Sequence, residues 1–490
     1  MINNGIFKKS TLILVLAICS ALAWADQKKN TEPPPKSAPK AKAAPAAKPA
    51  PAPSRPAQGA NRTNTGVPNR PAAGVGNRPT TGAGNRAATG MGNRPIAGRG
   101  GRTTQNVSLR GGGTAQISRR ANGRVADIHA NGMNIHQGVR GGRTIVSERN
   151  GRTFVSTGRR GGYVQRPYLS RNGRAYYQRT YVVGGRSYAR VYRGYDYRGV
   201  RYYGYAPGNY YHPGFYGWAY NPWMAPVYYS PAAWGWVGTP WFGFYGGFFT
   251  PYPVYPTASL WLTDYLIAAN LQAAYQAQAE ANAAAGGGAG QAPADNSGEQ
   301  PYGGPAASNQ TPLSPEVKQA IADEVQQQLA AEKGAAANPQ AAPSSDQVPD
   351  ALNPAERVFV VGTNLDVTVS TSGQECSLTP GDVVMRLSDG PDNNQNVSAS
   401  IQSSKKADCP TGQTVAIGVQ DLQEMHNQFR EQLDSGLKTL ADKGGTGGLP
   451  KAPDTATTGG EVPPPTPDSG AADQLQAQQQ QADQTQAQVQ

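Results

Sequence analysis

The chain has 490 residues, of which 60 are glycine and 41 are proline, and its formal net charge is +13. This composition excludes one large hydrophobic core, because much of the chain holds too few apolar side chains to bury one. We therefore predict a mainly β protein with a large disordered fraction. Its folded parts are an antiparallel β-meander with an aromatic layer and a helix, and a separate small β-barrel-like domain with a terminal helix.

Charge is distributed very unevenly along the chain. Residues 55–205 contain 27 arginines and no lysine against three carboxylates, which gives a net charge of +24. Residues 286–490 contain ten basic and 25 acidic side chains, which gives −15. Opposite charges favour association within the chain or between copies of it, and they equally favour capture of an external polyanion. Charge alone leaves these alternatives open.

Residues 1–25 have the pattern of a secretory signal peptide. Two lysines precede an apolar run over residues 12–22, and the small residues Ala23 and Ala25 stand at the cleavage positions. We expect an exported protein that is periplasmic, associated with the outer membrane or extracellular.

Removal of that leader leaves two cysteines, Cys376 and Cys409. In an oxidising compartment such a pair forms a structural bridge more often than a redox or metal site. We predict a disulfide between them.

Residues 26–102 are predicted to be disordered. Proline, alanine and lysine dominate to about residue 60, and an eight-residue repeat that begins at Asn61-Arg62 then carries glycine at its sixth position. The repeat is either a flexible basic spacer or a multivalent arm whose arginines contact an acidic polymer.

Residues 103–205 are predicted to form the β-meander, with seven to nine strands. Asn122-Gly123 and Asn131-Gly132 are turn signals for two-residue hairpins. Counting outward from them places Ile117 opposite Ile128 and Ile128 opposite Ile135, on one face. Later turns pair Val146 with Val155, Leu169 with Tyr176, and Tyr181 with Tyr188.

The opposite face of this meander carries Asp127, His129 and His136, with Asp127 directly opposite His136. Imidazole and carboxylate groups in this arrangement are candidate ligands for Zn²⁺ or Cu²⁺. A solvated polar face produces the same alternation, so we assign neither a metal nor a cofactor.

Arginine and tyrosine alternate through the later strands, and guanidinium and aromatic planes can stack there. This surface is predicted to bind an acidic polysaccharide, lipopolysaccharide or another envelope polyanion. Because we expect the protein to be exported, we do not predict intracellular nucleic acid as its binding partner. The alternative is that the tyrosines pack a sheet that lacks aliphatic side chains. The candidate polyanion-binding residues are Arg143, Arg152, Arg174, Arg186, Arg193, Arg198 and Arg201.

Residues 206–257 contain no charged side chain but many Trp, Tyr, Pro and Gly. Proline and glycine would leave backbone groups unpaired in lipid, so we reject a spanning helix. We expect an aromatic layer that covers the meander, makes peripheral contact with a membrane, or mediates self-association. A helix over 258–285 should pack on this layer.

The acidic half begins with a linker over 286–354 that contains a helix over 314–331. The small β domain is predicted over 355–443, and its terminal helix is expected to open at Asp421 with Glu424 completing a capping box. The Gln-rich tail over 444–490 is predicted to be disordered.

No motif in this sequence specifies a catalytic site, so we predict that the protein is not an enzyme. The leading hypothesis is a secreted or envelope-associated structural and adhesive protein that binds acidic polymers or envelope surfaces. The alternative is a periplasmic scaffold that recruits a protein partner through its C-terminal β domain.

Overall fold

The computed structural model describes residues 102–110, 112–158, 161–230, 234–236, 238–284, 311–338, 348–405 and 409–489. The predicted signal peptide, the predicted spacer up to residue 101 and the predicted linker stretches 286–310 and 339–347 lie outside these residues.

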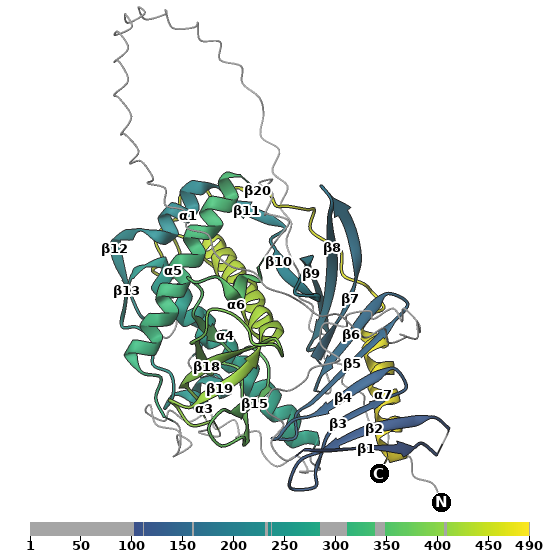
Figure 1. Ribbon diagram of the computed structural model, residues 1–490. Coiled ribbons are helices and arrows are strands. Elements are labelled where there is room, and N and C mark those ends of the chain that lie inside the picture. Colours follow the sequence, from purple (N-terminus) through teal and green to yellow (C-terminus); the bar gives the residue numbers. More distant parts are fainter. Residues whose placement is uncertain are drawn as a thin grey trace, which may run out of the picture. The chain divides into compact units, whose positions relative to one another are not determined.

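The described residues between 103 and 206 form a ten-stranded antiparallel sheet in which each strand pairs with the next along the chain (Figure 1). The predicted meander is therefore confirmed, with ten strands where seven to nine were expected. The strands are β1 (Thr103–Ser108), β2 (Thr114–Arg119), β3 (Val125–Ala130), β4 (Met133–Gln137), β5 (Arg143–Arg149), β6 (Arg152–Thr157), β7 (Gly161–Arg171), β8 (Arg174–Val183), β9 (Arg186–Tyr197) and β10 (Val200–Ala206).

Two-residue turns set the register of several hairpins in this sheet. The predicted two-residue turn at Asn122-Gly123 is wrong, because only Gly123 has a positive φ and the register shifts between Ser118 and Arg119. Asn131 and Gly132 have φ angles of 52° and 71°, in the left-handed region that asparagine and glycine tolerate best. The predicted pairs are present: Ile117 lies opposite Ile128, and Ile128 lies opposite Ile135. The later pairs are confirmed as well, namely Val146 with Val155, Leu169 with Tyr176, and Tyr181 with Tyr188.

The aromatic segment folds into short elements around a shared core. His212 caps the first helix, because its Nδ1 accepts a hydrogen bond of 3.3 Å from the Gly214 N–H. Phe215, Tyr245 and Phe249 are almost fully buried, so much of the segment packs internally. Its elements are β11 (Asn209–Tyr211), α1 (Pro213–Tyr220), β12 (Pro222–Tyr228), α3 (Pro240–Tyr245) and β13 (Val254–Thr257).

Two long helices complete this aromatic core, α4 (Ala258–Ala284) and α5 (Pro315–Ala337). They lie where the sequence predicts helices. A buried ion pair of 2.7 Å between Lys318 of α5 and Asp264 of α4 joins them. Among the described helices, none is long and apolar enough to cross a membrane.

The second sheet has six strands in the order β14-β17-β18-β19-β15-β16. Its end strands β14 and β16 do not pair with each other, so the predicted β-barrel-like domain is an open sheet in its described strands and not a closed barrel. Its strands are β14 (Val358–Val360), β15 (Leu365–Val369), β16 (Glu375–Leu378), β17 (Val383–Arg386), β18 (Asn396–Ser403) and β19 (Thr414–Gly418).

Helix α6 (Val419–Lys443) follows this sheet, and a one-turn 3-10 helix, η1 (Asp350–Leu352), precedes it. The predicted capping box is wrong, because α6 begins two residues before Asp421 and its N-cap Gly418 has no side-chain hydrogen bond. Glu424 instead binds an arginine of the meander. The apolar stripe of α6 is buried as its spacing predicts, in Leu422, Met425, Phe429, Leu433, Leu437 and Leu440.

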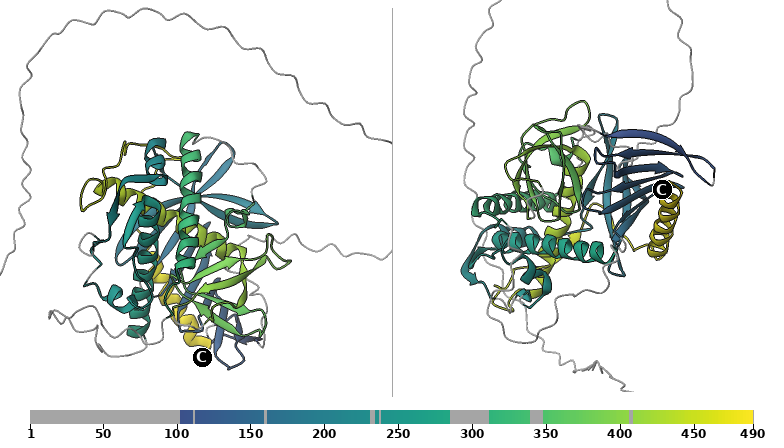
Figure 2. Two further views of the ribbon diagram at one scale, coloured as in Figure 1. Left: turned by 90° about the vertical axis from the view of Figure 1, so that its left-hand side faces the viewer. Right: turned by 90° about the horizontal axis from the view of Figure 1, so that it is seen from below.

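The tail differs from its prediction. Residues 457–459 form β20, which pairs with β11, and α7 (Ala471–Val489) lies along strands of the ten-stranded sheet (Figures 1 and 2). Leu475 and Ala482 of α7 are buried against side chains of that sheet. The composition of the tail suggested no fixed structure, but partners far away in the sequence hold it in place.

Candidate functional site

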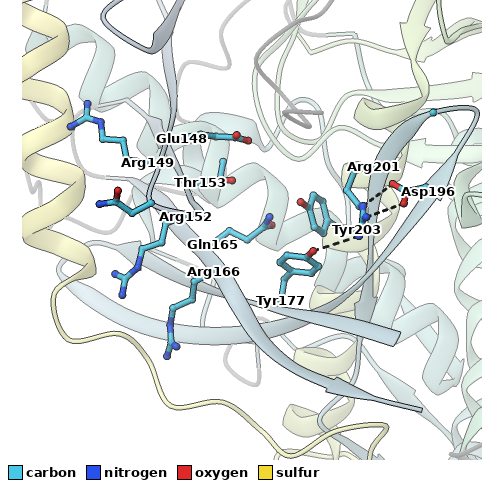
Figure 3. Close-up of a pocket in the computed structure, with 13 residues that line it drawn as sticks. Glu148, Arg149, Arg152, Thr153, Gln165, Arg166, Tyr177, Asp196, Arg201 and Tyr203 are labelled. Carbon is cyan, nitrogen blue, oxygen red and sulfur yellow. Dashed lines mark hydrogen bonds and ion pairs between the residues drawn. The ribbon is translucent and has the colours of Figure 1, made fainter. Parts of the chain in front are cut away.

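The sheet carries a pocket of about 680 Å³ at the β5–β6 hairpin tip and the adjoining parts of β7 to β10 (Figure 3). A volume of this size is typical of sites for small ligands or a few units of a polymer. The wall is formed mostly by polar, charged and aromatic side chains. Those labelled in Figure 3 are Glu148, Arg149, Arg152, Thr153, Gln165, Arg166, Tyr177, Asp196, Arg201 and Tyr203.

Two tyrosines and an arginine gather on one side of this pocket. The rings of Tyr177 and Tyr203 meet edge to face, with centroids 5.0 Å apart. Arg201 donates two hydrogen bonds to Asp196, of 2.7 and 2.9 Å, and its Nη1 lies 3.5 Å from the Tyr177 hydroxyl. These contacts fix a guanidinium beside two aromatic rings, an arrangement suited to stacking and hydrogen bonding together.

The close approach of Tyr177 to the neighbouring strand depends on Gly194. A Cβ added to Gly194 would lie 2.5 Å from Cε2 of Tyr177, and another side-chain contact of 3.3 Å would form with Arg201. Glycine is therefore required at this position for the ring to lie across the strand.

Three arginines form the other side of the pocket, and Figure 3 shows the side chains of Arg152 and Arg166 pointing away from the tyrosines. Arg152 binds Asp468 and Gln474 of the tail, each at 3.3 Å, and Arg149 binds Gln481. Arg166 donates to Gln178 at 3.1 Å. The pocket thus adjoins a row of guanidinium groups that the tail partly occupies.

The two carboxylates in the pocket wall, Asp196 and Glu148, differ in their hydrogen-bond partners. Both oxygens of Asp196 accept hydrogen bonds from Arg201, whereas partial burial raises the pKa of Glu148 and a hydrogen bond from Thr153 opposes this rise. Asp196 is thereby held as the partner of an arginine.

A fully buried arginine lies next to this pocket. Arg179 places its guanidinium carbon 4.0 Å from the ring centre of Tyr192 and 4.7 Å from that of Tyr163. Its Nη1 also donates to both carboxylate oxygens of Glu424, at 2.7 and 2.9 Å. Arg179 is not among the site residues predicted from the sequence. A signal was present in α6, where Gln420, Glu424, Asn427, Glu431 and Asp434 recur every three or four residues as a polar stripe opposite the apolar one.

That polar stripe contains buried carboxyl groups. Glu431 accepts a hydrogen bond from the Tyr192 hydroxyl, which also lies 2.6 Å from the Tyr181 hydroxyl. Burial raises the pKa of Glu431 to about 7 despite this bond and nearby Arg190. The tyrosine-rich end of the sheet therefore packs on α6 through charged and hydroxyl groups as well as apolar surface.

The seven arginines predicted to bind a polyanion are not gathered in one place. Arg143, Arg152 and Arg193 pair with Asp483, Asp468 and Glu461 of the tail. The pocket contains Arg152 and Arg201. Arg198 donates to the Pro391 carbonyl at 3.2 Å, Arg174 lies at the start of β8, and Arg186 is exposed at the start of β9. Association within the chain, one of the alternatives left open by the charge pattern, is therefore present.

The three metal-ligand candidates do not converge. His136 lies 2.7 Å from Asp127 through Nδ1, whereas His129 turns to Asn134. In the described part of the chain, no group of three or more His, Cys, Asp or Glu side chains is arranged to hold a metal ion.

Asp127 and His136 instead take part in the contact between the two sheets. His136 Nε2 lies 3.2 Å from Asp366 of β15, which also accepts a 3.0 Å bond from Arg120. Arg102, placed by the sequence analysis at the end of a disordered spacer, binds Asp127 and Glu375 at 2.7 and 2.5 Å. A network of charged groups therefore fastens the meander to the six-stranded sheet.

The predicted cysteine pair is confirmed. Cys376 and Cys409 form a disulfide, with their Cα atoms 5.2 Å apart, and both residues are buried. This bridge lies in the six-stranded domain whose Glu375 contacts the meander.

In comparisons with known proteins, no family model, no curated protein and no solved structure matches this chain. Fold and site together define a mainly β protein whose ten-stranded meander carries an arginine and tyrosine pocket.

Proposed function

We propose that this protein binds an acidic polysaccharide without chemically changing it, and that the pocket at the β5–β6 hairpin tip is the binding site. The observation that carries this proposal is the composition of the wall, where Tyr177, Tyr203 and Arg201 lie together on one side, and three further arginines adjoin them with Arg152 and Arg166 pointing away from the tyrosines. Sugar rings present C–H faces to aromatic side chains, and guanidinium groups bind carboxylates through paired hydrogen bonds. One pocket thus offers a contact for each part of a sugar acid.

Electrostatic attraction supports the same ligand class. The stretch 55–205 has a net charge of +24, and most of its described arginines lie on the meander. A polyanion would be attracted over a distance of ~8 to 10 Å at moderate ionic strength before it reached the pocket. The cellular role that we infer is structural and adhesive, in a secreted or envelope-associated protein. The signal-like leader and the disulfide are compatible with export.

The alternative, recruitment of a protein partner through the six-stranded domain, has less support. Asp366 and Glu375 of that domain bind Arg102, Arg120 and His136 of the meander. These contacts give the domain a role in holding the chain together, and among the described residues we find no contact that favours a protein ligand.

The test is equilibrium binding of polygalacturonate to the purified full chain. The double variant Arg149→Ala/Arg166→Ala removes two guanidinium groups of the pocket. Arg110→Ala/Arg124→Ala removes the same charge from exposed hairpin positions and is the matched control. We expect the pocket variant to bind at least ~10-fold more weakly, since a charge-assisted hydrogen bond contributes about 1.5 to 3 kcal/mol. The control should change affinity much less.

Three results would contradict parts of this proposal. Equal losses in both double variants would remove the pocket as the site and leave only diffuse charge attraction. Absence of binding at low salt would overturn polymer binding altogether. Shortening of the polymer during incubation would show that the protein acts as an enzyme.

A further inference from the structure

The C-terminal tail brings three carboxylates to three different strands of the meander. Glu461 binds Arg193 of β9 at 3.2 Å, and Asp468 binds Arg152 of β6 at 3.3 Å. Asp483 binds Arg143 of β5. These acidic groups are spread along the tail as the charges of a linear polyanion are spread along its backbone.

Other contacts hold the tail on the same face of the sheet. Gln478 of α7 donates to Ser147 at 2.9 Å and to the Phe154 carbonyl at 3.0 Å, and it accepts from Ser156 at 2.6 Å. The Tyr176 hydroxyl donates to Glu461 at 3.1 Å. The tail therefore lies in a defined position and is not a loose counterion.

The tail also reaches the pocket described above. Asp468 and Gln474 bind Arg152, and Gln481 binds Arg149, so two of the arginines in the wall already have partners in the tail. Figure 3 shows the tail passing beside Arg152 and Arg166. A polymer that uses Arg149 and Arg152 must take them from these partners.

Two of the three ion pairs that attach the tail are open to solvent, whereas Arg193 and Glu461 have side-chain exposures of only 10% and 17%. The side chain of Asp483 is 65% exposed and that of Arg152 is 39% exposed, so salt and competing anions reach both pairs. By contrast, the ion pair between Lys318 and Asp264 in the aromatic core is closed to solvent, because the Asp264 side chain is 0% exposed. An external anion can thus exchange with the tail at Arg143 and Arg152, whereas Gln478, Leu475 and Ala482 hold α7 through buried contacts.

We infer that residues 461–489 are an intramolecular competitor for the acidic polymer, an inference that rests on the proposed function. With the tail in place, its carboxylates neutralise Arg143, Arg152 and Arg193. A polymer of higher charge density displaces the tail, and these three arginines then extend the binding surface beyond the pocket. The tail in this way sets a threshold of ligand charge density below which the polymer does not bind strongly.

The first experiment measures the affinity of polygalacturonate for the full chain with Glu461→Gln, Asp468→Asn and Asp483→Asn combined. A matched control combines Asp323→Asn, Asp389→Asn and Asp442→Asn, three exposed carboxylates outside the tail. We expect the tail variant to bind at least ~10-fold more tightly than the unaltered chain, the gain expected when a competing state is removed. The control should gain less than about threefold, from long-range charge alone.

The second experiment follows hydrogen exchange of the α7 amides in the unaltered chain while polygalacturonate is added. We expect faster exchange in α7 as the polymer saturates the protein, because the helix leaves the sheet. Binding with unchanged exchange in α7 would overturn the competition and leave the proposed function intact, as would equal affinity gains in the two triple variants. If neither the unaltered chain nor the tail variant bound the polymer, both proposals would fall together.

Discussion

Asn427 of α6 completes the edge strand β10 through its side chain. Its Nδ2 donates to the Tyr203 carbonyl at 2.7 Å, and its Oδ1 accepts from the Tyr205 N–H at 2.9 Å. Edge strands expose unpaired backbone groups that invite aggregation, and proteins cover them in several ways. Here one amide side chain supplies the donor and the acceptor that a neighbouring strand would supply.

Replacing Asn427 by leucine should therefore destabilise the protein, by about 1 to 3 kcal/mol, since two buried backbone groups lose their partners. Urea denaturation measures this loss, and light scattering should detect increased self-association through the open edge of β10. Asn427→Asp is the control of the same shape. It keeps the oxygen that accepts from the Tyr205 N–H but loses the donor to the Tyr203 carbonyl. Unchanged stability in the leucine variant would mean that water replaces the amide.

The pair Arg179 and Glu424 offers a second prediction. Arg179→Met should cost about 3 to 5 kcal/mol of unfolding free energy, because it leaves a carboxylate without its partner at a largely buried site. Arg179 is 2% exposed as a side chain and Glu424 is 23% exposed. The double variant Arg179→Met/Glu424→Gln should recover part of the loss, and a double-mutant cycle gives the coupling energy. Strict additivity of the two changes would contradict the pairing.

The contact between the sheets should depend on pH through His136. Burial opposes the charge of this imidazole, but its hydrogen bonds to Asp127 and Asp366 outweigh burial and raise its pKa above 6.5. Its contribution to stability is therefore fully present below pH 6.5 and is lost as pH rises through the raised pKa. Burial also opposes the charge of Asp366, which alone would raise the pKa of this carboxyl group. The hydrogen bond from His136 outweighs burial, so the pKa of Asp366 lies below 3.8. That contribution is lost as pH falls through the lowered value.

We thus expect His136 to stabilise the contact most between about pH 3.8 and 6.5. Thermal unfolding of the full chain across pH 4 to 9 measures this dependence. His136→Asn should flatten the decline on the alkaline side, and His129→Asn, which leaves the His136 contacts in place, is the control. If the stability of His136→Asn fell at alkaline pH as much as that of the unaltered chain, other titrating groups would cause the pH dependence.

Gly132 tests how strongly a turn sets the register. Its φ of 71° is strained for any side chain branched at Cβ, so Gly132→Val should cost about 1 to 3 kcal/mol. Hydrogen exchange should rise first in β3 and β4, on either side of the turn. Gly217→Ala, at a helical position where an added Cβ meets no atom within 4 Å, should be tolerated. If the amides of β3 and β4 exchanged as slowly in Gly132→Val as in the unaltered chain, the turn at Gly132 would not set the register of this hairpin.

The disulfide should stabilise the six-stranded domain by restricting its unfolded state. Cys376 and Cys409 are 33 residues apart, and closing a loop of that length contributes ~3 to 4 kcal/mol in the chain-entropy model. Denaturation with and without a reducing agent measures this difference, and Cys376→Ala/Cys409→Ala should be insensitive to reduction. A free thiol at either position in the purified, non-reduced protein would contradict the bridge.

Local sequence signals determined the meander and much of its register. Asn-Gly and Gly-Gly turns require left-handed φ angles, so the pairing of Ile128 with Ile135 and of Tyr181 with Tyr188 follows from short-range chemistry. The turn at Arg198 and Gly199 was missed, because arginine rarely adopts the φ of 49° that it has there. The cap of α5, where the Ser314 side chain accepts a hydrogen bond from the Val317 N–H, and the helical spacing of the apolar stripe of α6 are equally local features.

Tertiary structure alone decided which charges meet. The sequence showed an excess of arginine in one half and of carboxylates in the other, but not that Arg179 would be buried on Glu424 or that Arg152 would bind Asp468. The separation between these partners is hundreds of residues, and no periodicity in either segment encodes it. A Gln-rich tail has little tendency to fold alone, so the order of α7 depends on the sheet that binds it. Turn chemistry acts between neighbouring residues and can be read from the sequence, whereas charge pairing and burial depend on surfaces that exist only after the chain has folded.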